Sequence, residues 1–205
     1  MSMFIFNSSL FFQIIASAIP LSILAYKRTT FNPYLTLILF ISFVIIILQT
    51  ITHFFEINNH ILFNFYVLCC FLLYFLFFTK NLKKNLILVA SIPFPIFIGF
   101  VLYEIFHNQL LIISFRITNI SLIYWSFLCF ISLLKDDSAI SNKTTLQIVN
   151  TSIFVYNSGS FILYLSIFSL MLDKYWFIHN FFEGGSKLLI AYAFWKLPKS
   201  DNFGK

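Results

Sequence analysis

Four polar side chains stand inside the last apolar stretch of the sequence, which runs from 175 to 196 as YWFIHNFFEGGSKLLIAYAFWK. They are His179, Asn180, Glu183 and Lys187. Imidazole, carboxylate and ammonium groups can exchange protons or hold a small polar ligand, and ionisable residues within a membrane-length segment are by default functional candidates. Glu183 and Lys187 stand four residues apart in the favourable order for an ion pair on one helical face, which lowers the cost of burying both. A structural ion pair and a functional one both agree with this spacing.

Two tryptophans indicate the depth of these side chains. Trp176 and Trp195 are nineteen residues apart in the sequence, which is roughly 28 Å along a helix and close to the thickness of a bilayer's hydrocarbon core. Tryptophan is enriched at membrane interfaces, so the pair marks the two ends of a span. Glu183 then lies roughly 10 Å and Lys187 roughly 16 Å from the first anchor. Both ionisable groups are therefore expected well inside the membrane.

Neighbouring spans supply polar side chains that could complete a binding site around Glu183 and Lys187. Tyr156, Asn157 and Tyr124 are expected to face these two residues, whereas most other hydroxyls and amides are expected only to join helices, at about 0.6 kcal/mol per bond. No catalytic residue is predicted. The candidate set for binding a ligand or an ion is His179, Asn180, Glu183, Lys187, Tyr156, Asn157 and Tyr124.

Histidines and carboxylates also recur at the expected outer ends of the spans. Each histidine of three such pairs stands three or four residues from a carboxylate, which puts both members of the pair on one helical face. The pairs are His53 with Glu56, Glu104 with His107, and His179 with Glu183. Imidazole and carboxylate are ordinary ligands of zinc, iron and copper, so an outward-facing cluster could hold a metal ion; histidine also suits the membrane interface because it has an apolar body and a polar tip. No other cofactor is predicted. The candidate metal ligands are His53, Glu56, His60, Glu104, His107 and His179.

The composition indicates an integral membrane protein, with the lipid bilayer as its first partner. Of 205 residues, 60% are hydrophobic and 10% are charged, and the mean hydropathy is +0.92, whereas charged residues approach ~25% of a soluble domain. The net charge of +6 does not indicate nucleic acid, because the basic residues lie between apolar segments. Cys69, Cys70 and Cys129 fall within apolar runs without CxxC spacing, so they predict neither a disulfide framework nor a zinc site.

Seven apolar stretches have the length that a membrane-spanning helix requires, which predicts an all-α bundle of seven transmembrane helices in one domain. The first stretch lacks the basic start of a signal peptide and is expected to remain as a helix. The fourth contains Pro93 and Pro95, which remove backbone donors and should kink or break it where neighbouring helices satisfy the freed carbonyls. The expected helices are 4–26, 34–55, 60–78, 86–106, 116–134, 148–172 and 175–196.

The distribution of lysine and arginine predicts the orientation of these spans, because cytoplasmic loops are enriched in both. With Lys187 inside a span, ten basic residues fall at one set of helix ends and two at the other. The N-terminus is therefore expected outside and the C-terminus in the cytoplasm, in the cytoplasmic membrane of a bacterium. The ten are Lys27, Arg28, Lys80, Lys83, Lys84, Lys135, Lys143, Lys196, Lys199 and Lys205; the two are Arg116 and Lys174.

The stretch from 154 to 195, with FVYNSGSFILYL, WFIHNFF and KLLIAYAFWK, resembles the last two helices of small, uncharacterised seven-helix bacterial membrane proteins and of similar modules in some membrane-bound sensors. The resemblance covers about a fifth of the chain. It implies a sensing role coupled to a cytoplasmic or membrane partner more than a reaction, and it transfers no functional residues.

Three functions follow from these features. The first is a sensor or accessory module whose outward polar pocket binds a small ligand, proton or ion and acts through a partner. The second is a small-solute or ion transporter with Glu183 and Lys187 near the midplane. The third is a metal-dependent intramembrane hydrolase, although seven-helix ceramidase-type enzymes need His-x-x-x-His where this chain has His179 and Glu183. A polar path from both faces would support transport, a pocket sealed below would support sensing, and three converging His or Glu ligands would support metal chemistry.

Overall fold

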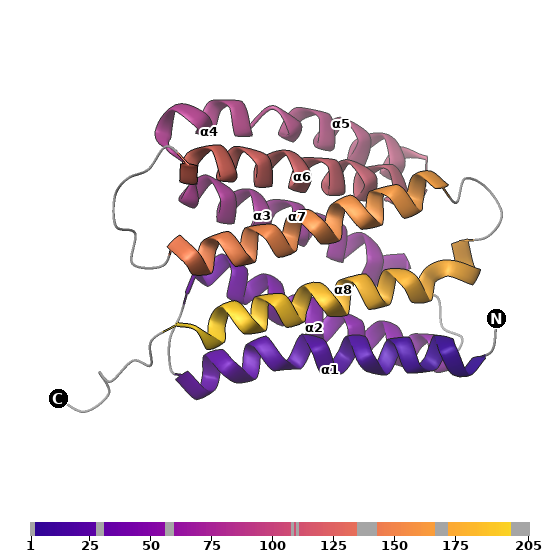
Figure 1. Cartoon of the computed structure of the whole chain (residues 1–205). Helices are drawn as coiled ribbons and strands as arrows, with labels where there is room; N and C mark the ends of the chain where they lie inside the picture. Colours follow the sequence, from indigo (N-terminus) through magenta and orange to yellow (C-terminus); the bar gives the residue numbers. More distant parts are fainter. Residues whose placement is uncertain are drawn as a thin grey trace.

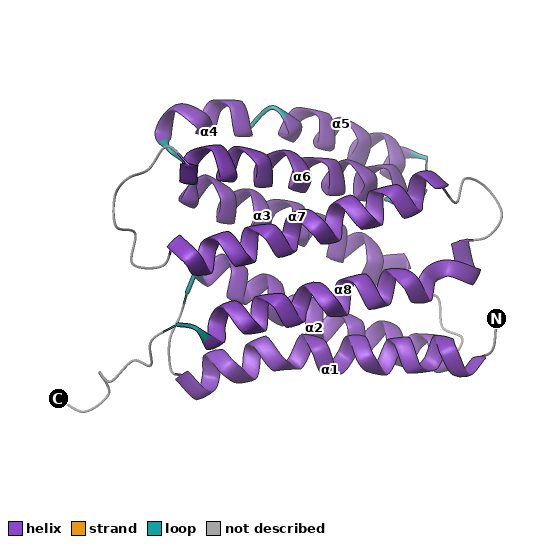
Figure 2. Cartoon of the chain, in the orientation of Figure 1, coloured by secondary structure: helices purple, strands orange, loops and turns teal. Residues whose placement is uncertain are grey.

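The computed structural model describes residues 3–27, 31–55, 60–107, 109, 111–134, 143–166 and 172–197. Within these ranges every regular element is an α-helix and no strand occurs (Figure 2). The all-helical fold predicted from the sequence is therefore confirmed. The helices are α1 Met3–Lys27, α2 Pro33–Phe54, α3 His60–Asn81, α4 Lys84–Ala90, α5 Pro93–Phe106, α6 Ile112–Leu134, α7 Lys143–Ser166 and α8 Leu172–Trp195 (Figure 1).

Several of the described helices are long and apolar enough to cross a membrane, as the composition predicts. They number five when α4 and α5 are taken as one stretch. The two others, α7 and α8, are each 24 residues long and contain more polar residues. The five stretches are Asn7–Lys27, Pro33–Phe54, His60–Asn81, Lys84–Phe106 and Ile112–Leu134.

The helices begin and end up to five residues away from their predicted bounds. α7 begins at Lys143 instead of 148, and α6 begins at Ile112 instead of 116. A helix continues through the polar residues at the ends of an apolar stretch, because its backbone hydrogen bonds do not depend on side-chain polarity. The apolar pattern therefore predicts the membrane-facing part of a helix and not the residues at which the helix begins and ends. The predicted end of this span at 172 is wrong, because Leu172 is the first residue of α8; residues 167–171 lie outside the described ranges.

The fourth apolar stretch is broken at its proline, as predicted. α4 ends at Ala90 and α5 begins at Pro93, which has no N–H to donate to Val89. The Val89 carbonyl accepts instead from the Ile92 N–H at 3.2 Å, and the Phe94 N–H donates to Ser91, which leaves the Ala90 carbonyl without a helical donor. Both carbonyls find donors on α6. The Tyr124 hydroxyl donates to Val89 at 3.0 Å and the Trp125 indole N–H donates to Ala90 at 2.7 Å. The neighbouring helix thus satisfies the break without exposing a carbonyl to lipid.

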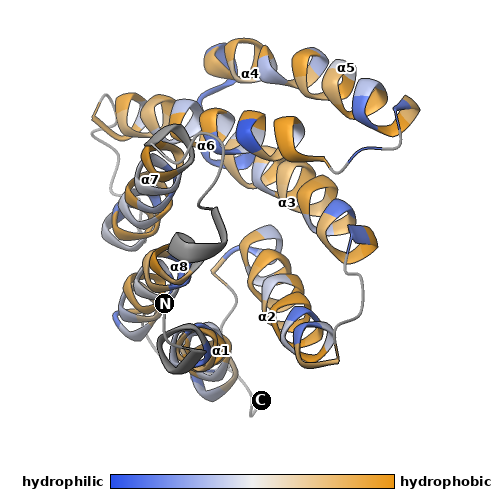
Figure 3. Cartoon of the chain, turned by 90° about the vertical axis from the view of Figure 1, so that its right-hand side faces the viewer, coloured by the Kyte–Doolittle hydropathy of each residue, from blue (hydrophilic) through white to orange (hydrophobic). Residues whose placement is uncertain are grey.

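Successive helices run in alternating directions along the bundle, except that α5 continues in the direction of α4 (Figure 1). α8 packs between α1 and α7, α6 packs against α7, α3 and α5, and α2 packs against α1 and α3. Seen from one end, these helices surround an interior, and α4 and α5 lie on the outside (Figure 3). Only 11% of the apolar window of Lys84–Phe106 is buried. The broken segment is therefore an edge element, and the interior belongs to the other helices.

Apolar side chains cover the outside of the bundle, and many polar side chains are buried. Ile61 and Leu88 are 85% and 80% exposed, whereas Asn150 and Ser160 are fully buried. A water-soluble fold would reverse this distribution, since exposed apolar surface is unfavourable in water. The arrangement suits a lipid environment, and the buried polar groups must satisfy one another.

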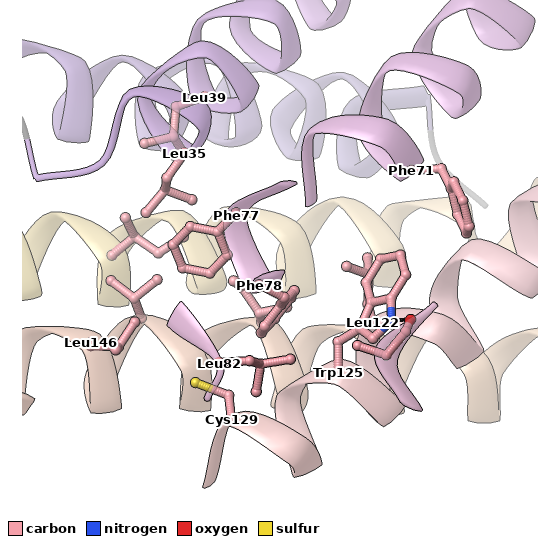
Figure 4. Close-up of a cluster of buried hydrophobic side chains, with 14 of the residues drawn as sticks. Leu35, Leu39, Phe71, Phe77, Phe78, Leu82, Leu122, Trp125, Cys129 and Leu146 are labelled. Carbon is pink, nitrogen blue, oxygen red and sulfur yellow. Dashed lines mark hydrogen bonds between the residues drawn. The ribbon is translucent and has the colours of Figure 1, made fainter. Parts of the chain in front are cut away.

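One half of the interior is packed mainly with apolar side chains (Figure 4). Phe77, Phe78 and Trp125 are fully buried there, together with Cys129 and Leu146. These residues lie near the end of the bundle at which α1, α3, α6 and α8 end, which we call the basic end because of the lysines found there. Polar side chains gather in the other half, so the two halves of the bundle differ in chemistry.

The described basic residues divide between the two ends as the alternating helix directions require. Arg116 and the backbone of Lys174 belong to the opposite end, where α6 and α8 begin; we call it the histidine end because His53, His60 and His107 lie there. Arg28, Lys135, Lys199 and Lys205 lie outside the described residues. The basic end has Lys27, Lys80, Lys83, Lys84, Lys143 and Lys196.

Candidate functional site

Glu183 lies near the middle of α8 and is only 5% exposed. Its Oε2 accepts a hydrogen bond of 2.6 Å from the Gln13 side-chain amide of α1. The same oxygen lies 3.8 Å from Nε2 of His179, and Oε1 lies 3.8 Å from Nζ of Lys187. The carboxylate therefore has an imidazole one turn away on one side, an ammonium one turn away on the other, and an amide from a second helix.

The three ionisable residues share one stripe of α8 because they are spaced four apart. This stripe faces the interior, since His179, Glu183 and Lys187 are all less than 9% exposed. The predicted Glu183–Lys187 pair is present, at an ion-pair distance that is too long for a direct hydrogen bond. The side chains that the sequence places within the membrane thus point away from lipid.

Gly184 allows α1 to approach α8 closely enough for Gln13 to reach Glu183. A Cβ atom at Gly184 would lie 2.3 Å from Cε1 of Phe12, so any larger residue would displace that ring. Small residues commonly permit such close approach between membrane helices. Gln13 is not part of the predicted site. The feature of the sequence that could have indicated it is the position of its amide within the first apolar stretch.

His179 lies between Glu183 and two hydroxyl groups of α7. Its Nε2 is 3.4 Å from the Tyr156 hydroxyl, and its Nδ1 is 3.4 Å from Oγ of Ser160. The predicted facing of Tyr156 towards the α8 stripe is confirmed. The neighbouring Asn180 instead donates to Oγ of Ser9 on α1 at 3.0 Å and so joins the two helices.

A cavity of about 30 Å³ adjoins Glu183 and Lys187 between α3, α6, α7 and α8. Asn157 and Asn119 line it and are 1% and 2% exposed. Oδ1 of Asn157 and Nδ2 of Asn119 have no hydrogen-bond partner among the described residues. The Asn157 amide is oriented by its own Nδ2, which donates to the Ile153 carbonyl at 2.7 Å. The facing predicted for Asn157 is therefore confirmed, and Asn119 adds a second amide.

Tyr124 requires a correction, because it does not face Glu183 and Lys187. Its hydroxyl donates to the Val89 carbonyl of α4, on the far side of α6 from α8. The residues of α6 that face the cavity are Phe115, Thr118, Asn119 and Leu122. The broken α4 thus determines the direction of Tyr124.

The carboxylate of Glu104, a predicted metal ligand, caps the start of α6. It accepts hydrogen bonds from the backbone N–H of Ile113 at 2.6 Å, from the N–H of Ser114 at 3.0 Å and from the Ser114 hydroxyl at 2.5 Å. Free N–H groups at a helix start favour a carboxylate. The 1% exposure of Glu104 therefore reflects a structural role.

The described members of the predicted metal cluster do not converge. His53, His60 and His107 are exposed, and His179 is buried beside Glu183. Across the part of the chain that the structure describes, no three His, Cys, Asp or Glu side chains are placed to hold a metal ion. Glu56 lies outside the described residues.

Buried polar side chains continue from Glu183 towards the basic end. Oγ of Ser152 donates to the Ser186 carbonyl at 2.7 Å, and the two hydroxyls are 2.8 Å apart. Further along α7, the Asn150 amide donates to the Ser126 carbonyl at 3.0 Å. The polar groups thus extend on both sides of Glu183 before the apolar half of the interior begins.

Comparison of the chain with protein-family models, with curated protein sequences and with solved structures gave no match. The resemblance of residues 154–195 to helices of sensor modules therefore stays a prediction from the sequence. The chemistry of the site follows from its own residues. A carboxylate, an imidazole and an ammonium on one stripe can hold and exchange protons, and the two amides can bind a small polar molecule.

Proposed function

We propose that the chain is a seven-span protein of the bacterial cytoplasmic membrane, with its N-terminus outside, that acts as a sensor or accessory module. It binds a proton or a small ion at Glu183 and transmits this event to a cytoplasmic or membrane partner. The alternating helix directions support seven crossings, with α4 and α5 together forming the fourth. The lysines at the basic end support a cytoplasmic location for that end.

The position of Glu183 is the observation on which this proposal depends. A carboxylate within a membrane bundle is costly unless it is paired or protonated, and here its partners come from two helices. A proton on Glu183 would remove the negative charge and so weaken the attraction to Lys187. It would also turn one carboxyl oxygen from an acceptor into a hydrogen-bond donor, and the Gln13 amide N–H, itself a donor, could not bond to it in the same way. The contact between α1 and α8 would therefore change with the charge on Glu183, and a partner protein bound to these helices could respond to that change.

A transporter is the second candidate, and the polar side chains on both sides of Glu183 favour it. His179 with Ser160 lies towards the histidine end, and Ser152 with Ser186 lies towards the basic end. The cavity of about 30 Å³ has room for one or two water molecules and not for a larger solute. The transported species in this alternative is therefore a proton or a small ion.

Infrared spectroscopy of the protein in liposomes tests whether Glu183 binds a proton. We expect acidification to produce a carboxyl C=O band that is absent from Glu183→Gln. Glu104→Gln is the matched control, because Glu104 is also buried but bonded to three donors at the start of α6. A band unchanged in Glu183→Gln would contradict the proposal. Proton flux into the same liposomes that disappears in Glu183→Gln would favour the transporter over the sensor.

A further inference from the structure

We propose that the cavity beside Lys187 is a water-binding site, in which one or two ordered waters bridge Lys187 to Glu183 and give protons a route to that carboxylate through the cavity. The water site stands on the geometry of the cavity alone. The proton route additionally rests on the proposed function of Glu183.

The distance between the two charged groups indicates a bridge. Nζ of Lys187 and Oε1 of Glu183 are 3.8 Å apart, although both residues are only 5% exposed. A direct N–H···O bond would bring these atoms to about 2.9 Å. A polar contact longer than a hydrogen bond is commonly mediated by water, and the adjoining cavity of about 30 Å³ has room for it.

The two unpartnered amide atoms supply complementary hydrogen-bonding groups. Oδ1 of Asn157 is an acceptor and Nδ2 of Asn119 is a donor, and both belong to residues that line the same cavity. Leaving a buried polar atom without a partner costs about 1–3 kcal/mol. Water in a polar cavity typically makes about three hydrogen bonds. Asn157, Asn119 and the Lys187–Glu183 pair together offer that number.

The charges around the cavity favour water over an ion. A cation would meet the ammonium of Lys187, and an anion would meet the carboxylate of Glu183, whereas a neutral water molecule can bond to both. Gln13 on α1 carries no titratable group, and neither do the cavity residues of α6, which are Phe115, Thr118, Asn119 and Leu122. The titratable side chains that face Glu183 or the cavity are Tyr66, Cys70 and Tyr74 of α3, Tyr156 of α7, and His179 and Lys187 of α8.

The waters complete a line of proton-exchanging groups through the site. His179 lies next to Glu183 on the side of the histidine end, and the cavity adjoins Glu183 and Lys187 between α3, α6, α7 and α8. When protonated Glu183 gives its proton to the bridging water, that water returns one of its own protons to the carboxylate, so that both groups regain their original charge. Only O–H bonds break and form, and no electron is transferred. Glu183 can therefore exchange protons with the cavity water as well as with His179.

Radiolytic hydroxyl-radical labelling with mass spectrometry tests the water site in the native protein, because radicals formed from bound water oxidise adjacent side chains. Two native cysteines provide a matched comparison. Cys70 lines the cavity and is 5% exposed, whereas Cys129 lies in the apolar half and is 0% exposed. We expect Cys70 to be oxidised several-fold faster than Cys129. Equal rates would overturn the water site, and this result needs no variant that must fold.

Two variants then test whether the amides hold the water. Asn157→Leu removes the acceptor and occupies the cavity, so we expect the Cys70 rate to fall to that of Cys129. Asn150→Leu is the control on the same helix; its Oδ1 is also unpartnered, but Asn150 does not line the cavity, so the Cys70 rate should remain high. A Cys70 rate that falls equally in both folded variants would contradict the assignment.

The proton route has a separate measurement. In deuterated buffer the carboxyl band of Glu183 should shift several-fold more slowly in Asn157→Leu than in the unchanged protein. An unchanged exchange rate would overturn the route and leave the water site standing. If acidification of the unchanged protein produces no carboxyl band from Glu183, the proposed function is overturned instead, so the two failures are distinguishable.

Discussion

At the scale of single residues, Glu183 and Lys187 depend on each other. Both are nearly fully buried, and neither has a second group of opposite permanent charge among its described contacts. Removing one partner of a buried pair leaves an uncompensated charge and typically costs 3–5 kcal/mol, whereas removing both can be nearly neutral. The pair therefore couples two turns of α8 energetically, and its presence does not by itself raise the stability of the folded state.

A double-mutant cycle measures this coupling. We expect Glu183→Gln and Lys187→Met each to lower the stability of the folded state by about 3 kcal/mol, and the double variant to lose less than the sum of the two. The measurement is the thermal unfolding midpoint in detergent. Lys84→Met, at an exposed lysine, is the control and should leave the midpoint unchanged. Additive effects of the two single changes would show that the residues do not interact.

At the scale of helices, α1 and α8 are held together at two levels. In the middle, Phe12 packs over Gly184 and Gln13 bonds to Glu183. At the basic end, the Lys27 ammonium donates to the carbonyls of Trp195 and Leu197 and lies 5.5 Å from the Trp195 ring centre. A cation that bonds the last carbonyls of a helix satisfies acceptors that have no partner within that helix. The Glu183 site is thus bounded by a firm contact between the first and last helices.

Two neighbouring glycines allow this contact to be tested. Gly184→Ala places a Cβ 2.3 Å from the Phe12 ring, whereas Gly185→Ala meets nothing within 4 Å. Both changes should gain up to about 1 kcal/mol of helix propensity, so their difference isolates the steric effect. We expect Gly184→Ala to be less stable than Gly185→Ala by about 1–3 kcal/mol in thermal unfolding. It should also shift the frequency of the Glu183 carboxyl band, because the hydrogen bonding of that carboxyl changes when the Gln13 amide moves away. Equal stability of the two variants would mean that Phe12 rotates aside freely.

At the scale of the whole molecule, the bundle combines a polar half with an apolar half. The polar half contains Glu183 and the cavity, and the apolar half contains Phe77, Phe78 and Trp125 (Figure 4). The apolar half lies at the basic end, so an ion reaching Glu183 from that side would have to cross it. This packing agrees with a site that is open to protons through a few waters and closed to larger solutes.

Labelling of single cysteines tests the orientation of this arrangement. In a variant without Cys69, Cys70 and Cys129, we place a cysteine at Gln109 or at Lys84, which are exposed at opposite ends of the bundle. Because basic residues favour the cytoplasmic side, an impermeant thiol reagent should label the cysteine at 109 on intact cells and the cysteine at 84 only after permeabilisation. The reverse pattern would place the N-terminus in the cytoplasm, and labelling of both on intact cells would contradict a membrane-spanning fold.

By itself the sequence determined the features that depend on neighbours along the chain. Apolar length gave the helices, Pro93 gave the break between α4 and α5, and the spacing of His179, Glu183 and Lys187 gave their shared stripe. Each of these follows from backbone geometry or from the fixed rotation of residues around a helix axis.

Only the tertiary structure decided which helix each polar side chain meets. Tyr124 bonds to α4, Glu104 caps α6, and Gln13 reaches Glu183 across a gap of 170 residues in the sequence. A soluble helix reveals its buried face by an apolar stripe, but a helix in lipid is apolar on both its lipid-facing and its protein-facing sides. The pattern of one span therefore does not indicate its neighbours. Contacts between distant segments, such as the one that Gly184 allows, determine where the buried polar groups find their partners.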